Sequence, residues 1–316
     1  MTNVYVLCPD EDMPIGGVLK LYDFVDTLNC NHINSFIIHE KPRFSVTWFK
    51  NDTKVKDINS VNIQKDDLVI LPEIWADKVL ILWPGIRKII YNQDSFNTFF
   101  PFSDNLQLVK TIYHHPDVVQ VMVVSEYDLE VMSWLFPDKH IKRIIHGINE
   151  KLFYFCPQKK KQIAFMPRKG RQDFQFLDYL LALKNSMDGF TVSIIEKMSF
   201  EESAKMLRES AIFLSFSHKE GFGLPPAEAM ACGCIVIGYH GQGGKEYFKK
   251  NLTFNIEQSD LYNYAKQVCN VIEQFRINPS STLQIGRQAS EYILKNYSCV
   301  HQENSILLAI NHLIKK

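Results

Sequence analysis

The sequence predicts an α/β protein built from two doubly wound domains, each with a parallel sheet. Short runs rich in β-branched residues alternate with longer segments of helical periodicity, and this alternation restarts after a basic connector in the middle of the chain. The chain has 316 residues. That is long for a single hydrophobic core, so two domains of about 150 residues each are expected.

The first half contains five runs that we expect to be strands. They are VYVLC (4–8), SFIIH (35–39), DLVIL (67–71), KIIY (88–91) and VQVMVVS (119–125). Between the first two lies GVLKLYDFVDTL, whose apolar residues recur with a helical period. Ser125 begins the capping-box pattern SEYD, and the helix that it starts should stop at Pro137. IKRIIHGI (141–148) is expected to give one more short strand, which ends at Gly147.

A basic segment marks the expected domain boundary. Residues 139–171 hold ten Lys or Arg and one acid, on a chain whose formal net charge is zero. The polar connector CPQKKKQ lies within this segment. We therefore expect domains at 1–155 and 156–298, with a final helix at about 299–316 that packs back on the first. The basic segment is either a solvated face or a contact surface for anionic lipid headgroups.

The second half repeats the α/β pattern. Its expected strands are QIAFM (162–166), TVSII (191–195), AIFLSF (211–216) and CIVIGY (234–239). A long helical pattern follows and is interrupted near Tyr297. Ligands of such sheets bind beyond the carboxyl ends of the strands, so two such domains predict a cleft that holds a ligand.

Composition excludes several classes of function. Hydrophobic residues make up 46% and charged residues 22%, as in ordinary globular proteins. Zero net charge argues against a duplex nucleic acid as partner. No apolar run reaches membrane-spanning length and the N-terminus lacks signal-peptide features, so we expect a cytoplasmic protein. The seven scattered cysteines fit a reducing compartment. For Cys232 and Cys234, packing is favoured over metal ligation.

The most informative stretch is EGFGLPPAE (220–228), which follows a predicted strand. GFGLP is expected to form a turn, and PAEAMACG a short helix that Gly233 closes. Gly221 and Gly223 would let a ligand approach the backbone, and the start of a helix offers N–H groups to an anion. The pattern therefore predicts a site for phosphate.

Glu220 and Glu228 would repel phosphate, but a carboxylate can accept hydrogen bonds from both hydroxyls of a diol. Acids on both sides of a phosphate-binding loop therefore indicate a ligand with a central diphosphate and a sugar at each end. In this interpretation Glu228, in the first turn of the helix, holds the ribose and Glu220 reaches the other sugar. The alternative is that Glu228 only complements the helix dipole and Glu220 is a surface residue.

The full stretch EGFGLPPAEAMACGCIVIG (220–238) resembles the donor-site motif of retaining glycosyltransferases of the GT-B fold. The resemblance is to the large sucrose- and mannosyl-transferase-like family (glycosyltransferase family 4-like), with some rhamnosyltransferase-like features. It implies two Rossmann-like domains that face each other across a cleft. It also implies that Glu220 contacts the transferred sugar. The donor-binding residues that it implies are Gly16, Gly17, Ser217, Gly221, Phe222, Gly223, Leu224 and Glu228.

The resemblance also implies cations for the diphosphate, and FMPRKGRQD (165–173) supplies them. Arg168 and Lys169 are the expected pair and Arg171 is close behind, although the same residues also fit a solvated basic turn. Gly16 and Gly17, in PIGGV (14–18), resemble the loop of the acceptor domain that closes over the donor phosphate. An ordinary turn at the start of a helix fits them nearly as well.

One segment departs from the family pattern. Many relatives carry a catalytic histidine where this chain has IIYNQDSFNTFFP (89–101), which holds none. The segment is similar to the Gln-Asp-aromatic segment of rhamnosyltransferase-like members. Gln93 or Asp94 is therefore expected to face the transferred sugar, and His114 and His115 are expected to be loop residues.

The resulting prediction is a retaining hexosyltransferase that uses a nucleotide-diphosphate sugar and a saccharide or lipid-linked acceptor. No Asp-x-Asp motif is present, so neither a metal nor a cofactor is expected, and the protein is either free in the cytoplasm or peripheral at the inner membrane face. The alternatives are a GT-B epimerase or hydrolase and a catalytically inactive nucleotide-sugar-binding partner. A dehydrogenase is suggested only weakly by GQGG (241–244), because no Gly-x-Gly-x-x-Gly opens a helix.

Overall fold

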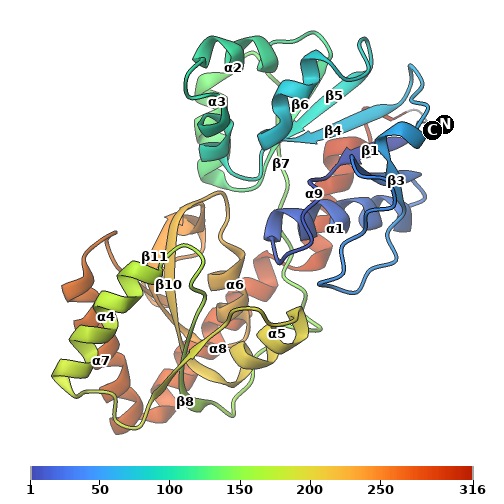
Figure 1. Cartoon of the computed structure of the whole chain (residues 1–316). Helices are drawn as coiled ribbons and strands as arrows, with labels where there is room; N and C mark the ends of the chain where they lie inside the picture. The colour runs from blue at the N-terminus through green and yellow to red at the C-terminus, as the bar shows by residue number, and fades with distance from the viewer. Residues whose placement is uncertain (1, 315–316) are drawn as a thin grey trace. The chain divides into compact units, whose positions relative to one another are not determined.

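The computed structural model describes residues 2–314, which form two compact units (Figure 1). Unit 1 comprises the chain up to His146 together with the segment from Val300 onward, and unit 2 spans Gly147–Cys299. The division expected from sequence was 1–155, 156–298 and a returning helix at about 299–316. Residues 315–316 of that expected helix lie outside the described residues.

Unit 1 contains a seven-stranded sheet in the order β3-β2-β1-β4-β5-β6-β7. Every neighbouring pair in it is parallel. Its strands are β1 (Val4–Leu7), β2 (Ser35–His39), β3 (Val55–Asp57), β4 (Leu68–Pro72), β5 (Arg87–Tyr91), β6 (Val118–Val123) and β7 (Ile141–Arg143). The sequence predicted six of them. It missed β3, because three partly buried residues, two of them charged, carry no apolar pattern.

Helices cover both faces of this sheet. They are α1 (Gly16–Cys30), α2 (Leu106–Tyr113), α3 (Glu126–Leu135) and α9 (Cys299–Ile310), with short 3-10 segments η1 (Ile58–Ser60), η2 (Glu73–Leu80), η3 (Ser95–Thr98) and η4 (Phe100–Phe102). Residues of η2, α2 and α3 share one apolar core with β1, β4, β5 and β6. On the other side α1 and α9 are joined where Lys20 Nζ donates to Gln302 Oε1 at 2.9 Å. Ser125 Oγ caps α3 by accepting from the Asp128 N–H, and α3 ends before Pro137, as predicted.

Unit 2 contains a five-stranded parallel sheet in the order β12-β11-β10-β8-β9. Its strands are β8 (Lys160–Phe165), β9 (Thr191–Ile194), β10 (Ser210–Glu220), β11 (Ile235–Gln242) and β12 (Thr253–Asn255). Four were predicted, and the short β12 was not. Both units therefore have the doubly wound α/β architecture that the sequence predicts.

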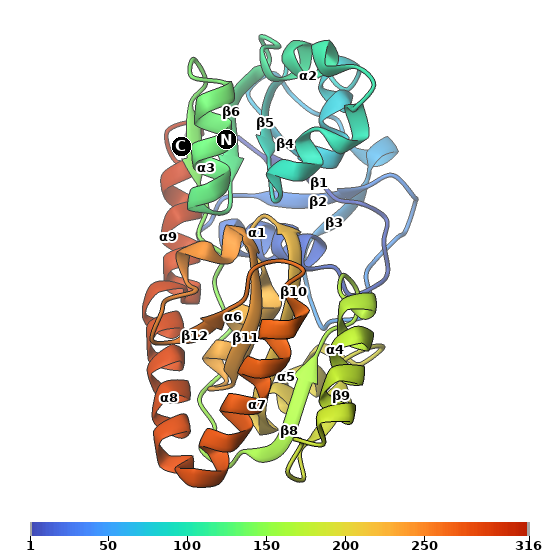
Figure 2. The same cartoon turned by 90° about the vertical axis from the view of Figure 1, so that its left-hand side faces the viewer.

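The helices of unit 2 form a layer on each side of the sheet (Figure 2). They are α4 (Arg171–Lys184), α5 (Phe200–Glu209), α6 (Leu224–Ala231), α7 (Leu261–Ile277) and α8 (Pro279–Asn296), with η5 (Gly243–Glu246). α4 packs with α7, and α6 packs with α5 and α8. The break between α8 and α9 falls at Tyr297, as expected.

The Cys-x-Cys pair lies inside unit 2. Cys232 and Cys234 are both buried, and Cys234 Sγ donates to the Leu207 carbonyl at 3.0 Å. Burial raises the pKa of both thiols, so they stay protonated and pack as small apolar groups. No described helix is both long and apolar enough to cross a bilayer.

Candidate active site

The central strand of unit 2 extends further than the sequence predicted. We expected β10 to end at Phe216, but it continues to Glu220. Its pairing with β11 shifts register between Ser217 and Glu220, and Lys219 adopts a positive φ of 47°. An extra residue of this kind turns a strand and re-aims the side chain that follows. The irregularity therefore sets the direction of the Glu220 carboxylate at the carboxyl end of the sheet.

Two glycines, Gly241 in the neighbouring strand β11 and Gly243 just after it, leave room for this turn. A Cβ added at Gly241, whose φ is +66°, would lie 3.0 Å from Glu220 Cβ. A Cβ added at Gly243 would lie 1.9 Å from the Gly221 carbonyl oxygen, which is impossible without moving the backbone. The GQGG stretch, which the sequence linked only weakly to a dinucleotide, thus lets the two chain segments approach closely.

A buried tyrosine orients the peptide groups of the glycine loop. The Tyr247 hydroxyl donates to the carbonyl oxygens of Phe222 and Gly223, at 3.0 and 2.5 Å. No peptide bond of the described chain is cis, and in a trans peptide the C=O and the following N–H point in opposite directions. The N–H groups of Gly223 and Leu224 therefore point away from Tyr247. Two adjacent N–H groups that face the same way suit an anion.

The helix after the loop begins earlier than predicted. α6 starts at Leu224, with Pro225 and Pro226 as its second and third residues, and Gly223 precedes it with φ of +83°. Because proline has no N–H, the prolines add no donor to the helix start. Only the N–H groups of Gly223 and Leu224 serve this end of the helix.

This earlier start corrects one expectation. Glu228 is not in the first turn, because it is the fifth residue of α6. The prediction failed because we took Pro226 as the first helical residue, whereas the helix begins at Leu224 and both prolines lie in its first turn. Glu228 is only 8% exposed, so complementing the dipole at an open helix end does not explain its position.

Of the three predicted cations, the structure brings Lys169 to the loop. Lys169 Nζ lies 3.0 Å from Glu220 Oε1 and donates to the Lys219 carbonyl at 3.1 Å. Arg168 is exposed and forms no ion pair with any residue in 2–314. Arg171 is instead paired with Glu196 at 2.7 Å. Lys169 therefore holds positive charge at the carboxyl end of β10.

Much of the remaining basic segment is neutralised within its own unit. Ion pairs join Arg143 to Glu126, Lys160 to Glu209 at 2.5 Å, and Lys161 to Asp188 at 3.2 Å. Pairs near the surface contribute little stability, but they reduce the positive charge that the segment presents.

Two further residues of unit 2 lie near the end of β10. Ser217 Oγ, predicted to bind the donor, lies 3.2 Å from Ser215 Oγ. His218 Nε2 lies 3.2 Å from Asp173 Oδ2, which also accepts from the Tyr239 hydroxyl at 3.1 Å. The sequence did not single out His218, Asp173 or Tyr247. For Tyr247 the available signal was its position just after the GQGG stretch.

The candidate residues of unit 1 form their own group. Gln93 Nε2 donates to the Gly17 carbonyl at 3.2 Å, so the segment after β5 is linked to the start of α1. Gly16 is the first residue of α1. The Asp94 carboxylate caps η3 by accepting from the Phe96 N–H at 3.0 Å.

The two histidines considered from sequence lie just after α2. His114 is the C-cap of that helix and lies 3.3 Å from Asp138, and His115 lies 3.8 Å from Asp117. Among residues 2–314 no group of three or more His, Cys, Asp or Glu is arranged to hold a metal ion.

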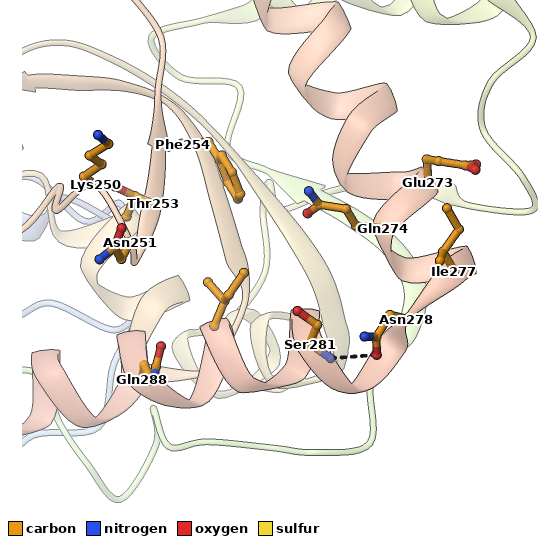
Figure 3. Close-up of a pocket in the computed structure, with 11 residues that line it drawn as sticks. Lys250, Asn251, Thr253, Phe254, Glu273, Gln274, Ile277, Asn278, Ser281 and Gln288 are labelled. Carbon is orange, nitrogen blue, oxygen red and sulfur yellow. Dashed lines mark hydrogen bonds between the residues drawn. The ribbon is translucent and has the colours of Figure 1, made fainter.

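A hollow of about 640 Å³ opens elsewhere in unit 2 (Figure 3). It lies between the start of β12 and the junction of α7 with α8, and Phe254, Gln274 and Gln288 are among its lining residues. β12 runs parallel to β11, and β11 to β10, so the hollow lies toward the amino ends of the strands. The glycine loop lies at their carboxyl ends. The hollow is therefore separate from the loop.

Comparison with known proteins places the loop in a family. Residues 182–288 match the family described as Glycosyl transferases group 1. An alpha-1,6-glucosyltransferase of Actinobacillus pleuropneumoniae serotype 7 (strain AP76) is 30% identical over 296 residues, which cover 88% of this chain and 86% of that protein. A putative glycosyltransferase 41 of Sulfolobus islandicus filamentous virus (isolate Iceland/Hveragerdi) is 34% identical over 103 residues, 30% of each chain.

Solved structures share the fold at low sequence identity. Sucrose-phosphate synthase from Thermosynechococcus elongatus has a TM-score of 0.71 at 14% identity, covering 99% of this chain and 98% of that one. Anabaena HepE in complex with UDP-glucose has a TM-score of 0.73 at 13% identity, covering 99% of this chain and 100% of that one. One conclusion follows from the two parallel-sheet units, the matched loop and the relative that matches 88% of the chain. This chain belongs to the GT-B glycosyltransferases, which take the transferred sugar from a nucleotide-sugar donor.

Proposed function

We propose that the protein transfers a hexose, with retention of anomeric configuration, from a nucleotide-diphosphate sugar to a saccharide or lipid-linked acceptor, without a metal. The observation that carries this proposal is the ion pair between Lys169 and Glu220 at the end of β10. It places a cation and a hydroxyl-binding acid together, next to a loop with two N–H groups that point the same way. A sugar diphosphate needs both kinds of group within a few ångströms.

The donor is assigned to unit 2 as follows. The diphosphate is bound by the N–H groups of Gly223 and Leu224 and by the side chains of Lys169 and Arg168. The two cations form charge-assisted hydrogen bonds to the phosphate oxygens. Gly221 and Phe222 complete the backbone that lines the diphosphate, and Ser217 lies at its edge. Glu228 accepts hydrogen bonds from the ribose hydroxyls. Glu220 accepts a hydrogen bond from a hydroxyl of the hexose, which replaces part of its contact with Lys169.

In the reaction, the bond between the anomeric carbon and the diphosphate oxygen breaks, and a bond from that carbon to the acceptor oxygen forms. The acceptor proton passes to the leaving phosphate oxygen on the same face of the sugar. Lys169, Arg168 and the loop N–H groups stabilise the charge that develops on the leaving diphosphate, which is the electrostatic contribution that usually dominates. No step requires a divalent ion, because these cations supply the charge.

From unit 1, Gln93 faces the transferred sugar, and Gly16 and Gly17 close over the donor phosphate. Asp94 is a weaker candidate for contact with the sugar, because its carboxylate already caps η3. The alpha-1,6-glucosyltransferase relative and the UDP-glucose complex of HepE favour UDP-glucose as the first donor to test.

The test is thermal-shift screening with UDP-, GDP-, ADP- and dTDP-sugars, with and without EDTA, followed by product analysis with and without acceptors. We expect one donor to stabilise the protein equally with and without chelator, and Glu220→Gln to abolish sugar transfer. Glu209→Gln is the matched control, because Glu209 forms a similar ion pair with Lys160. Loss of stabilisation in EDTA would refute the metal-free mechanism.

The competing functions give different products. Free sugar or an epimer, formed at full rate without acceptor, would assign the chain to the hydrolases or epimerases. Tight nucleotide binding without any turnover would assign it to the inactive binding partners. A lipid-linked acceptor predicts binding to vesicles that contain anionic lipids, and no vesicle binding would favour a free saccharide.

A further inference from the structure

A buried acid follows directly after β4 in unit 1. Glu73 is 3% exposed and is the first residue of η2. Its Oε2 accepts from the backbone N–H of Gln93 at 3.0 Å, and its Oε1 accepts from Asn97 Nδ2 at 3.4 Å. Both donors lie in the segment after β5. Glu73 therefore ties together the chain that leaves two adjacent strands at the carboxyl edge of the sheet.

The side chain of Gln93 continues this connection to α1. Its Nε2 donates to the Gly17 carbonyl, and its Oε1 is buried without a hydrogen-bond partner in the described part of the chain. A Cβ built at Gly17 would lie 3.5 Å from Oε1, so the carboxamide lies directly against this glycine. Buried acceptors are rarely left unpaired, and each one calls for an explanation such as a catalytic role.

The surroundings of Glu73 favour its un-ionised form. Burial raises the pKa of Glu73 to about 8. The negative charge of Asp94 also raises this pKa, whereas the hydrogen bond from the Gln93 N–H lowers it. The other titratable groups that face it are Tyr91 from β5 and Tyr113 from α2. Burial raises the pKa of both phenols, so they stay neutral, and none of these groups is a cation.

We propose that Glu73 is a positioning residue for glycosyl transfer. Through the Gln93 N–H it holds the Gln93 carboxamide against Gly17, so that Gln93 Oε1 is positioned to accept a hydrogen bond from a hydroxyl of the transferred sugar. This role rests on the proposed function, in which Gln93 faces that sugar. An ionised Glu73 would be an unpaired buried charge, which draws in water and displaces the Gln93 segment.

The same strand supplies a control. Asp67, 2% exposed, precedes β4 at its amino end and accepts backbone N–H groups from Asn3 and Gln64, each at 2.8 Å. Its hydrogen bonds are of the same kind as those of Glu73, but it lies at the edge of the sheet away from the candidate residues. A purely structural role for Glu73 predicts that its substitutions resemble those of Asp67.

The test compares wild type, Glu73→Gln, Glu73→Leu and Asp67→Asn, with UDP-glucose as the donor, from pH 6 to 9.5. For wild type and Asp67→Asn we expect kcat to fall as the pH rises through about 8. Glu73→Gln, which mimics the protonated acid, should keep its kcat through that range. Glu73→Leu should lose about tenfold or more in kcat, with a smaller change in KM, because the Gln93 N–H loses its acceptor.

A second measurement does not depend on turnover. Amide hydrogen exchange of residues 91–97 and 14–20 should become faster in Glu73→Leu and stay near wild type in Glu73→Gln and Asp67→Asn. If this pattern appears but no donor is turned over, Glu73 still holds the Gln93 segment in place, and the proposed function is what fails. The inference is overturned if Glu73→Gln keeps the alkaline fall of wild type, or if exchange in Glu73→Leu is unchanged.

Discussion

Replacing Gly223 by alanine tests whether the glycine loop is shaped by its backbone and by Tyr247. The φ of +83° at Gly223 lies in the left-handed region, where an L-residue costs about 1–2 kcal/mol. The new Cβ would also lie 2.9 Å from the Tyr247 hydroxyl, closer than real contacts allow. Moving that hydroxyl leaves two buried carbonyls without their donor, at about 1–3 kcal/mol. The expected total is about 2–5 kcal/mol.

Gly189→Ala is the matched control for this change. Gly189 is in the same unit and has a φ of +78°, but a Cβ there would meet only the end of the Lys161 side chain, at 3.8 Å. It should therefore cost only the backbone part, about 1–2 kcal/mol. The difference between the two variants isolates the contact with Tyr247.

The assay uses the distribution of tryptophans. All four, Trp48, Trp75, Trp83 and Trp134, belong to unit 1. Urea unfolding followed by fluorescence thus reports unit 1, and circular dichroism reports both units. Gly223→Ala should lower the circular-dichroism midpoint without moving the fluorescence midpoint, and it should weaken UDP-glucose binding. The reasoning is refuted if Gly223→Ala and Gly189→Ala lose equal stability and bind the donor equally.

Three further outcomes are expected. Tyr247→Phe should destabilise unit 2 by about 1–2 kcal/mol and raise KM for the donor. In a Gly223→Ala background the same substitution should destabilise unit 2 by less, and a double-mutant cycle measures this difference. Lys169→Met should lower kcat/KM for UDP-glucose by about a hundredfold or more, whereas Lys161→Met should leave it unchanged. The pKa of Glu73 is raised from 4.5 to about 8. Between these pH values native unit 1 therefore binds one more proton than the unfolded chain does. Its free energy of unfolding falls as the pH rises through this range, by up to about 5 kcal/mol in total. Glu73→Gln should flatten this slope in fluorescence-detected urea unfolding, and parallel slopes for the two proteins would contradict it.

Most of the fold could be predicted because its strands are buried on both faces. Runs such as VYVLC are apolar throughout, so they can be recognised as strands without knowing which strands they pair with. Two of the edge strands, β3 and β12, were missed for the opposite reason. Each has three residues, and Thr253 in β12 is the one buried residue of the two strands, so their sequences carry no clear hydrophobic period.

The candidate site was predicted only where its residues are close in sequence. The stretch from Glu220 to Glu228 contains its own glycines and acids, so it could be recognised as one unit. Lys169 could be proposed from charge, but its contact with Glu220 depends on the pairing of β8 with β10. Tyr247 and Glu73 were missed, because each makes its hydrogen bonds with groups that are distant in the sequence, and the position of Tyr247 just after GQGG is only a weak signal. For Glu228, the first turn of the helix was placed two residues too late, because Pro226 was taken as the first helical residue.

The order in which the two units become complete follows from the path of the chain. Most of unit 1 is synthesised before unit 2, yet unit 1 also needs α9, whose Ala309 carbonyl accepts from buried Gln120 and whose Ser305 accepts from the Ile145 N–H. A ribosome delivers α9 after unit 2, so unit 1 is completed only after the unit that follows it in the chain. A fragment cut at the link between the units would therefore lack α9, and a fragment meant to isolate unit 1 has to include the segment from Val300 onward.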